Sequence, residues 1–234
     1  MPGRVLLVAT PIGNLDDLSP RAVAAFAAAD LVACEDTRRT GLLLHHLGLK
    51  KPLVSLHDHN ERTRLPQLLA RLEQGQTIAV ASDAGTPLLS DPGYLLTRAA
   101  IAAGHGVEAI PGASAPLTAL LVSGLPPYPF TFAGFAPPRS GKRRAFYAKL
   151  AALGHTIVVF ESPHRLLASL DDALAELGDR RAAIARELTK THEEVVRGSL
   201  SDLRADFAAR DRLLGEFVLV IGGGGPEPRE GADD

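Results

Sequence analysis

The sequence predicts a protein made of two α/β domains. Its first half alternates short apolar strand patterns with helical patterns, which is typical of an α/β domain with a mostly parallel sheet. The run GLPPYP at residues 124–129 interrupts this alternation, because three prolines in four residues exclude both a helix and a central strand. A second set of strand and helix patterns follows. We therefore expect an N-terminal domain over residues 1–123, a linker over 124–130 and a C-terminal domain over 131–222.

Each element has its own pattern. Short apolar runs predict strands at residues 4–10, 31–34, 51–56, 77–81 and 107–110, and helical patterns between them predict helices at 20–29, 39–47, 61–73, 94–103 and 115–121. In the second half, strands are expected at 130–135, 156–160, 182–188, 193–198 and 216–221, and helices at 143–152, 163–177 and 201–210. Residues 223–234 are acidic and rich in Gly and Pro, and we expect them to form a disordered tail.

Composition limits the class of protein. The chain has 234 residues, of which 46% are hydrophobic, and a formal net charge of −2, so its overall charge does not indicate nucleic-acid binding. Its one cysteine, Cys34, excludes an internal disulfide and suits a reducing cytoplasm, where we expect the protein to lie. No run of 18 apolar residues predicts a membrane helix, and the first residues lack the pattern of a secretory signal.

The most informative loop is SDAGTPLLSDPG at residues 82–93, between a predicted strand and a predicted helix. Such a loop lies at the carboxyl edge of a parallel sheet, where α/β proteins bind ligands. Gly85 allows close approach of a ligand to the backbone, and Asp83 and Asp91 can accept hydrogen bonds from it. A structural turn with helix-capping aspartates is the alternative interpretation.

Two further loops follow strands in the same half of the chain. ATPIGNLDD at residues 9–17 has neither the Gly-Lys-Ser/Thr of a phosphate loop nor the spaced glycines of a dinucleotide fingerprint, so an uncharged or cationic ligand is favoured. IPGASA at residues 110–115 offers small side chains against which a flat ring or sugar can lie, although Ser114 is also a natural helix cap. Together the three loops predict a pocket at one sheet edge.

At this point the chain resembles a known family. The strings that carry the resemblance span residues 4–221 and are, in order, VATPIGNLDDLSPRA, CEDTRRTGLLL, HDHNE, ASDAGTPLLSDPG, IPGASA, FAGF, FESPHR, RELTKTHEE and GEFVLV. They are similar to the tetrapyrrole methylase superfamily and, within it, to the bacterial enzymes that methylate the ribose 2′-hydroxyl of a cytidine in the decoding region of 16S ribosomal RNA.

The resemblance implies two α/β domains of the tetrapyrrole-methylase type with a ligand cleft between them, S-adenosylmethionine as methyl donor, and a homodimer. It implies that the donor-binding residues are Pro11, Asp83, Gly85, Thr86, Pro87, Ser114 and Ala115 in the first domain, and Phe160 and Leu188 in the second. The implied substrate is 16S rRNA, and the near-neutral charge favours the assembled small ribosomal subunit over naked RNA.

Two loops of the second half supply the charged candidates for catalysis. FESPHR at residues 160–165 and RELTKTHEE at 186–194 each follow a predicted strand. Transfer of a methyl group to a ribose hydroxyl requires positioning and a proton acceptor, for which Glu161, Glu187 and Lys190 are candidates. A lysine base would need burial or a cationic neighbour to lower its pKa. Arg165 and Arg186 are better interpreted as clamps for phosphate or carboxylate.

A basic run is the candidate RNA contact. Five basic and no acidic residues lie between positions 139 and 149, and we predict RNA contacts from Arg139, Lys142, Arg143 and Arg144. Four such contacts would give a salt slope of about −2.8 on single-stranded RNA. The pair His57 and His59 has no accompanying cysteine or second cluster, so no metal site is expected.

Other functions stay open. A relative of the same superfamily can methylate a tetrapyrrole or a modified protein histidine, and a ribosome-bound protein that does no chemistry belongs to another class altogether. The string RELTKxxEE and the basic run favour an RNA substrate over the first alternative. A phosphotransferase is disfavoured because no phosphate loop with a lysine is present.

Overall fold

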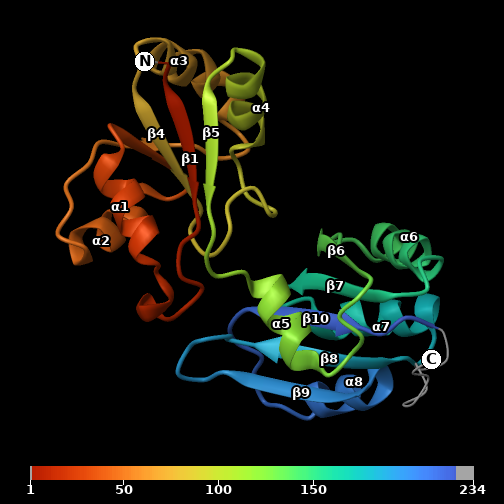
Figure 1. Ribbon diagram of the computed structural model, residues 1–234. Helices are drawn as coiled ribbons and strands as arrows, with labels where there is room; N and C mark the ends of the chain where they lie inside the picture. The colour runs from red at the N-terminus through yellow and green to blue at the C-terminus, as the bar shows by residue number, and fades with distance from the viewer. Residues whose placement is uncertain (1, 225–234) are drawn as a thin grey trace, which may run out of the picture. The chain divides into compact units, whose positions relative to one another are not determined.

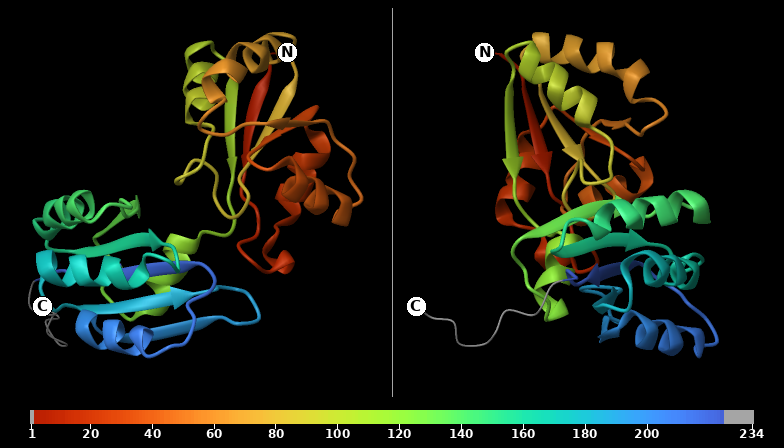
Figure 2. Two further views of the ribbon diagram at one scale, coloured as in Figure 1. Left: turned by 180° about the vertical axis from the view of Figure 1, so that it is seen from behind. Right: turned by 90° about the vertical axis from the view of Figure 1, so that its right-hand side faces the viewer.

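A computed structural model describes residues 2–224. The chain divides into two compact units, the first ending at Ser114 and the second beginning at Ala115. Each unit contains one five-stranded sheet. Figure 1 shows the ribbon of each unit with most of its helices and strands labelled, and Figure 2 gives two further views.

The first unit is a parallel α/β domain. Its strands are β1 (Arg4–Val8), β2 (Leu31–Cys34), β3 (Leu53–Ser55), β4 (Thr77–Ala81) and β5 (Gly106–Ile110), in the order β3-β2-β4-β1-β5. All four strand pairings are parallel, so the carboxyl ends of β4, β1 and β5 lie next to one another at one edge. This confirms the parallel sheet that the alternating pattern predicts.

Helices cover both faces of this sheet (Figure 1). α1 (Pro20–Ala28) and α2 (Thr37–His46) pack on the face that carries Leu6 and Val8, whereas α3 (Glu61–Glu73) and α4 (Tyr94–Ala102) pack on the face that carries Val5 and Ile78. Alternate strand residues point to opposite faces, which explains why the fully buried strands are apolar throughout. A short 3₁₀ helix, η1 (Leu15–Asp17), follows β1.

The second unit has a mixed sheet. Its strands are β6 (Phe130–Phe135), β7 (Thr156–Glu161), β8 (Arg181–Arg186), β9 (Glu194–Ser199) and β10 (Phe217–Ile221), in the order β6-β7-β10-β8-β9. Only the β6·β7 pair is parallel; β10 runs antiparallel to both β7 and β8, and β8 runs antiparallel to β9. α6 (Ser140–Ala151), α7 (Leu166–Leu177) and α8 (Leu200–Ala208) bury Tyr147, Leu170 and Phe207 in its core.

The boundary between the domains differs from the prediction. α5 (Ala115–Ser123) packs against β7, β8, β9 and β10 and thus belongs to the second unit, so the division falls at residue 114 rather than at 123. The proline-rich run at 124–129 is a connection within the second unit, where the Thr156 hydroxyl donates to the Pro126 carbonyl at 2.6 Å. Most of the predicted tail at 223–234 lies outside the described residues.

Candidate methyl-donor and RNA site

Three loops of the first unit meet at the carboxyl edge of its sheet, as the sequence predicts. They follow β1, β4 and β5, which are neighbours in the sheet. Thr10 and Gly85 exchange backbone hydrogen bonds of 2.9 and 3.0 Å, which join the first loop to the second. The Thr86 hydroxyl donates to the Ala113 carbonyl at 3.0 Å, which joins the second loop to the third. The loops therefore form one connected wall.

Two glycines allow the loops of this wall to pack closely against one another. Gly85 has φ +83°, and a Cβ there would lie 3.1 Å from Cγ2 of Ile12. A Cβ on Gly112 would lie 2.9 Å from the Cβ of Ala9, which is closer than side-chain carbons tolerate. Only glycine fits at these two positions while the loops stay in contact. Pro11 and Pro87 lie in the same loops, and Pro11 is half-buried.

The loop at 82–93 also holds residues in an unfavourable backbone conformation. Leu88 and Ser90 have φ of 72° and 70°, in the left-handed region that residues with a Cβ rarely occupy. Among the described residues the remaining non-glycine cases are Glu187 and Thr189, in the second unit. All four thus lie in two of the loops that the sequence singles out, 82–93 and 186–194, and such strain is typical of functional sites.

Carboxylates gather at the same edge. Asp83 accepts a hydrogen bond from the backbone N–H of Asp36 at 3.0 Å. Burial and then the charge of Asp83 raise the pKa of Glu35, while burial and then the charge of Glu35 raise the pKa of Asp91 to about 7. Loss of hydration on burial is the larger cause of both pKa shifts, and repulsion from neighbouring carboxylates adds to it. A cationic group is the kind of ligand that this edge favours.

The remaining donor-binding candidates lie at the unit boundary and in the second unit. Ser114 is buried and ends the first unit, and Ala115 begins α5. Phe160 lies near the end of β7, with its ring 4.9 Å from that of Phe132. Leu188 is buried directly after β8. Since β10 separates β7 from β8 in the sheet, Phe160 and Leu188 lie two strands apart at one edge.

Glu161 is buried, whereas an accessible base would be exposed. Its side chain is 0% exposed, and its Oε1 lies 3.0 Å from Nε of Arg165. The same oxygen accepts from the backbone N–H of Ser162 at 2.8 Å. A carboxylate enclosed in this way orients Arg165, whose guanidinium is partly exposed. The other oxygen, Oε2, is buried without a hydrogen-bond partner among the described residues.

Lys190 and Glu187 form one ionic network. Nζ of Lys190 lies 2.9 Å from Oε1 of Glu187 and 3.0 Å from Oε2 of Glu216. Desolvation opposes the charged lysine, but the hydrogen bonds to Glu187 and Glu216 outweigh it and raise the Lys190 pKa. Desolvation likewise opposes ionised Glu187, but the bonds from Lys190 and the Glu216 N–H prevail and lower its pKa. Both side chains are therefore ionised at neutral pH.

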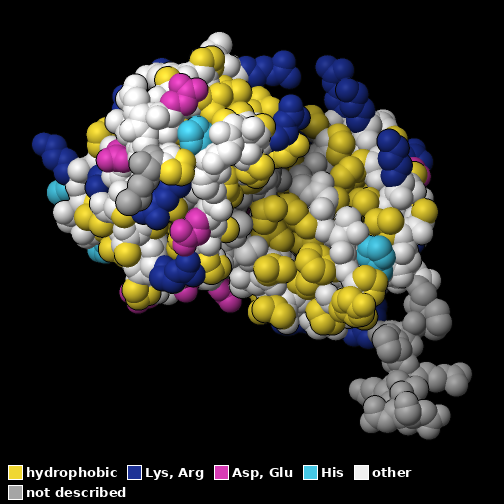
Figure 3. All heavy atoms as spheres, turned by 45° about the horizontal axis from the view of Figure 1, so that its top comes forward, with side chains coloured by type: hydrophobic (Ala, Val, Ile, Leu, Met, Phe, Trp, Pro, Cys, Tyr) yellow, Lys and Arg dark blue, Asp and Glu magenta, His cyan; other side chains and the backbone are white. Residues whose placement is uncertain are grey.

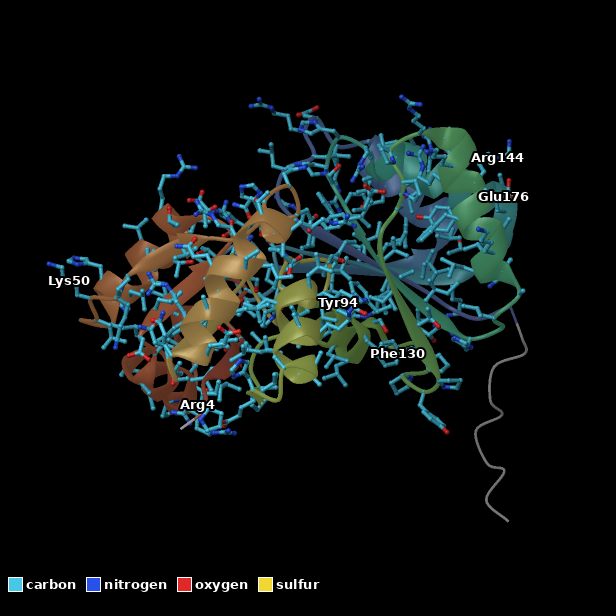
Figure 4. All side chains as sticks on the ribbon, turned by 90° about the horizontal axis from the view of Figure 1, so that it is seen from above. Arg4, Lys50, Tyr94, Phe130, Arg144 and Glu176 are labelled. Carbon is cyan, nitrogen blue, oxygen red and sulfur yellow. The ribbon has the colours of Figure 1, made fainter. Side chains whose placement is uncertain are left out.

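The basic run divides into exposed and buried members. Arg139, Lys142 and Arg144 are exposed, and Arg144 lies 2.6 Å from Glu176 (Figure 4). Arg143 is 3% exposed, and its guanidinium lies 2.7 Å from Oδ2 of Asp172. The run forms the start of α6. Successive residues of a helix point in different directions, so Arg143 points into the core while its neighbours point to solvent. Arg143 thus holds α6 to α7, contrary to the predicted RNA contact.

The other candidate clamp, Arg186, is partly exposed. Its Nε donates to the Leu214 carbonyl at 2.7 Å, and Nη1 lies 3.5 Å from Glu194. Figure 3 draws one face of the molecule, on which basic, acidic and hydrophobic side chains are all exposed.

No group of three or more metal-ligating side chains occurs within residues 2–224. The side chain of His57 lies beside Asn60, with 3.1 Å between Nε2 and Nδ2, and the His57 and His59 rings are 6.0 Å apart. Within the same described range, no helix combines the length and the apolar character needed to cross a membrane.

Glu61 is a functional candidate that the sequence left without a role. It is 6% exposed, and its Oε1 accepts from the backbone N–H groups of Gly93, Leu95 and Leu96. In the sequence, Glu61 stands out only as the last residue of the string HDHNE. The sequence alone does not show which helix start its carboxylate caps, because the two segments are distant in the chain.

Comparison with known proteins places the chain in a family. The family model of the tetrapyrrole (corrin/porphyrin) methylases matches residues 4–204. A ribosomal RNA small subunit methyltransferase I from Mycobacterium tuberculosis is 52% identical over 227 residues, which are 96% of this chain and 79% of that protein. Proteins of the same name from Mesorhizobium japonicum and Haemophilus influenzae are 49% and 46% identical, over 97% and 94% of this chain and 78% and 79% of theirs.

Solved structures agree on the fold. A diphthine synthase superposes with a TM-score of 0.73 at 17% identity, covering 94% of this chain and 90% of that one. A uroporphyrin-III-C-methyltransferase from Thermus thermophilus gives 0.65 at 23% identity and 94% of both chains. At these identities the likeness establishes the fold alone. The family match and the relatives lead to one conclusion: the chain belongs to the tetrapyrrole methylases, a family of S-adenosylmethionine-dependent methyltransferases.

Proposed function

We propose that the chain transfers a methyl group from S-adenosylmethionine to the ribose 2′-hydroxyl of a cytidine in the decoding region of 16S rRNA. The observation that carries this proposal is the identity of about half of all positions, over nearly the whole chain, with proteins named ribosomal RNA small subunit methyltransferase I. We further propose that the substrate is the assembled small subunit, that the protein acts as a homodimer and that it works in the cytoplasm.

The residues of the first unit fit the donor. Gly85 and Gly112 let the three loops pack against one another and so shape the wall of the proposed donor site. The carboxylates Asp83 and Asp91 at the same edge favour a cation. When bound, S-adenosylmethionine supplies a methyl group made electrophilic by a positive sulfur. The proposed donor-binding residues are Pro11, Asp83, Gly85, Thr86, Pro87, Ser114 and Ala115, with Phe160 and Leu188 from the second unit.

The charged groups of the second unit suit positioning more than proton removal. The cationic Lys190, held by Glu187 and Glu216, is placed to attract a ribose or phosphate oxygen. Glu161 orients Arg165, which with Arg186 is a candidate phosphate clamp. Orientation of the two reactants alone can contribute on the order of 7–11 kcal/mol to lowering the barrier. The hydroxyl proton still needs an acceptor, and ionised Glu187 stays the candidate for it among the charged groups of this network.

The exposed cations at the start of α6 complete the proposed RNA surface. Arg139, Lys142 and Arg144 belong to it, whereas buried Arg143 does not. Three contacts instead of four reduce the expected salt slope to about −2.1.

The test is a labelling experiment with methyl-tritiated donor. The protein is incubated with small subunits that lack the modification, with the same rRNA free of protein, and with a tetrapyrrole precursor. We expect label in the subunit, at a single cytidine whose 3′ phosphodiester becomes resistant to alkali, because a methylated 2′-oxygen cannot attack it. Label in the tetrapyrrole alone would refute an RNA substrate, and donor binding without any transfer would indicate a non-catalytic protein.

A further inference from the structure

A pocket of about 340 Å³ opens in the first unit beside the donor loops. One side is formed by the loop after β1 and by Ser82 and Asp83 after β4. The other side is formed by α2, through Arg39, Thr40, Leu42, Leu43 and His46. It shares Pro11 and Asp83 with the proposed donor site, but Gly85, Thr86, Pro87 and Ser114 do not line it. The pocket therefore adjoins the proposed donor site and is not the same place.

The helix on the far side of the pocket carries basic side chains. α2 contains Arg38, Arg39, His45 and His46, and Arg38 pairs with the helix-capping Asp36 at 2.8 Å. Arg39 is 64% exposed at its side chain, and together with His46 it faces the pocket. Asp83 lines the same pocket opposite Arg39, so the two charges offset each other. A lining of this kind suits an uncharged base better than the sulfonium and ammonium groups of the donor.

The remaining lining suits a flat ring. Leu15, Leu42 and Leu43 supply apolar surface, and Leu15 and Leu42 are 48% and 71% exposed. Single-stranded RNA is recognised by bases that leave the stack and lie against apolar or planar groups. Enzymes that extrude a nucleotide hold its base in a pocket. A base held there would also fix the position of the attached ribose, which carries the reacting hydroxyl.

Donor and acceptor groups lie side by side in the pocket. Nη1 of Arg39 is 3.6 Å from Oδ2 of Asp83, which is longer than a hydrogen bond, so both groups keep hydrogen-bonding capacity. The other oxygen, Oδ1, is held by the N–H of Asp36. A pyrimidine with an amino group beside a ring nitrogen and a carbonyl needs one acceptor next to one donor. Asp83 and Arg39 provide that pair.

From this geometry we infer that the pocket between α2 and the loop after β1 receives the extruded base of the target nucleotide, with Arg39 and Asp83 reading its edge. The inference rests on the proposed function, because it names the part of the RNA that this edge of the first unit binds. Arg39 is a specificity-determining residue in this scheme, and α2 adds an RNA contact in the first unit to those proposed in the second.

The experiment compares neighbours on one helix. Arg39→Ala and His46→Ala alter the pocket, whereas Arg38→Ala and His45→Ala remove the same kinds of side chain from positions that do not line it. The full chain, saturated with S-adenosylhomocysteine, is titrated into small subunits reconstituted with fluorescent 16S rRNA that has the target cytidine or an abasic nucleotide at that position. Calorimetry with S-adenosylhomocysteine measures donor-site affinity separately.

We expect Arg39→Ala to weaken binding of the intact RNA about tenfold, the discrimination typical of one good base contact. It should leave binding of the abasic RNA, and the affinity for S-adenosylhomocysteine, within twofold of wild type, and Arg38→Ala should affect both RNAs equally. Equal losses on both RNAs for Arg39→Ala would make it a phosphate contact and overturn the inference. A tenfold loss of S-adenosylhomocysteine affinity would assign the pocket to the donor. Failure of the wild type to bind S-adenosylhomocysteine at all would overturn the proposed function itself.

Discussion

Oε1 of Glu61 accepts a hydrogen bond of 3.0 Å from the backbone N–H of Gly93. The same oxygen accepts from Leu95 and Leu96 at 2.9 and 3.2 Å, so the first residue of α3 caps the N-terminus of α4. Gly93 ends the loop at 82–93, which begins at β4. Glu61 therefore anchors the far end of the loop that carries Asp83, Gly85 and Thr86.

Removal of this cap should destabilise the first unit. Glu61→Ala leaves three backbone N–H groups without their acceptor, and we expect a loss of roughly 2–3 kcal/mol in the free energy of unfolding. Glu61→Gln keeps an acceptor oxygen and should recover most of it. Denaturant titration measures the loss, and hydrogen exchange at residues 82–96 should rise in the alanine variant. Ser199→Ala, which removes the capping box of α8, is the matched control and should leave that exchange unchanged. An alanine variant as stable as wild type would contradict the anchoring role.

The pair Arg143 and Asp172 should behave as structure and not as RNA surface. Arg143→Ala leaves a buried carboxylate without its partner, and we expect a loss of about 3–5 kcal/mol in the free energy of unfolding. Arg144→Ala, at the next and exposed position, should change stability by about 0.5 kcal/mol or less. Thermal or chemical denaturation of the two variants decides between these roles, and similar stabilities would show that the ion pair is dispensable.

The exposed cations of α6 should govern the salt dependence of RNA binding. Replacing Arg139, Lys142 and Arg144 by Ala should reduce the magnitude of the slope of log K against log salt by about 2, because each contact contributes about 0.7. Arg204→Ala on α8, where the guanidinium pairs with Asp171, serves as the charge control. An unchanged slope in the triple variant would remove α6 from the RNA surface.

The charge on Lys190 makes a kinetic prediction. Since the hydrogen bonds to Glu187 and Glu216 overcome desolvation and raise the Lys190 pKa, this side chain stays protonated well above neutral pH. A lysine base would make kcat rise tenfold per pH unit in this range. We expect kcat to be independent of pH between about 7.5 and 9 as far as Lys190 is concerned. Lys190→Met should lower kcat strongly, while Lys149→Met at the end of α6 should not. A proportional rise of kcat with hydroxide, abolished in Lys190→Met, would restore Lys190 as the base.

Asp91 should make stability depend on pH. Burial, the charge of Glu35 and the more distant Asp83 and Asp58 raise its pKa from 3.8 to about 7, against the hydrogen bond from Ser82. Between these two values the folded state holds a proton that the unfolded state has lost, so this group's contribution to stability falls as pH rises from about 4 to 7. Asp91→Asn removes that loss and should raise the melting temperature more at pH 8 than at pH 4. Asp17→Asn, at an exposed position, is the control; an equal shift at both pH values would contradict the raised pKa.

The sequence predicts the elements of this fold well, because apolar periodicity and proline positions act locally. It also predicts that the loops after β1, β4 and β5 meet, since the carboxyl ends of neighbouring parallel strands share one edge. It misplaces the domain boundary because prolines mark where regular structure stops, and not which sheet the preceding helix covers. α5 is apolar on several sides, with Leu117 and Leu121 exposed, so its pattern does not show which side of the helix faces a sheet.

For the charged residues, too, the sequence predicts local features but not those that depend on contacts between distant segments. A run of basic residues predicts a positive surface, but the phase of α6 decides that Arg143 turns inward to Asp172 while its neighbours stay in water. The role of Lys190 likewise depends on Glu216, which is 26 positions away in the chain. Contacts between distant segments fix such roles, and a local pattern contains no information about them.

The paired backbone bonds between Thr10 and Gly85 have a consequence for evolution and for engineering. The two segments are joined through their main chains, so a shift of one backbone displaces the other. Whether a substitution in one segment is tolerated therefore depends on the residues present in the other. Epistasis between these positions is therefore expected to be large, and effects of single substitutions here should not be summed.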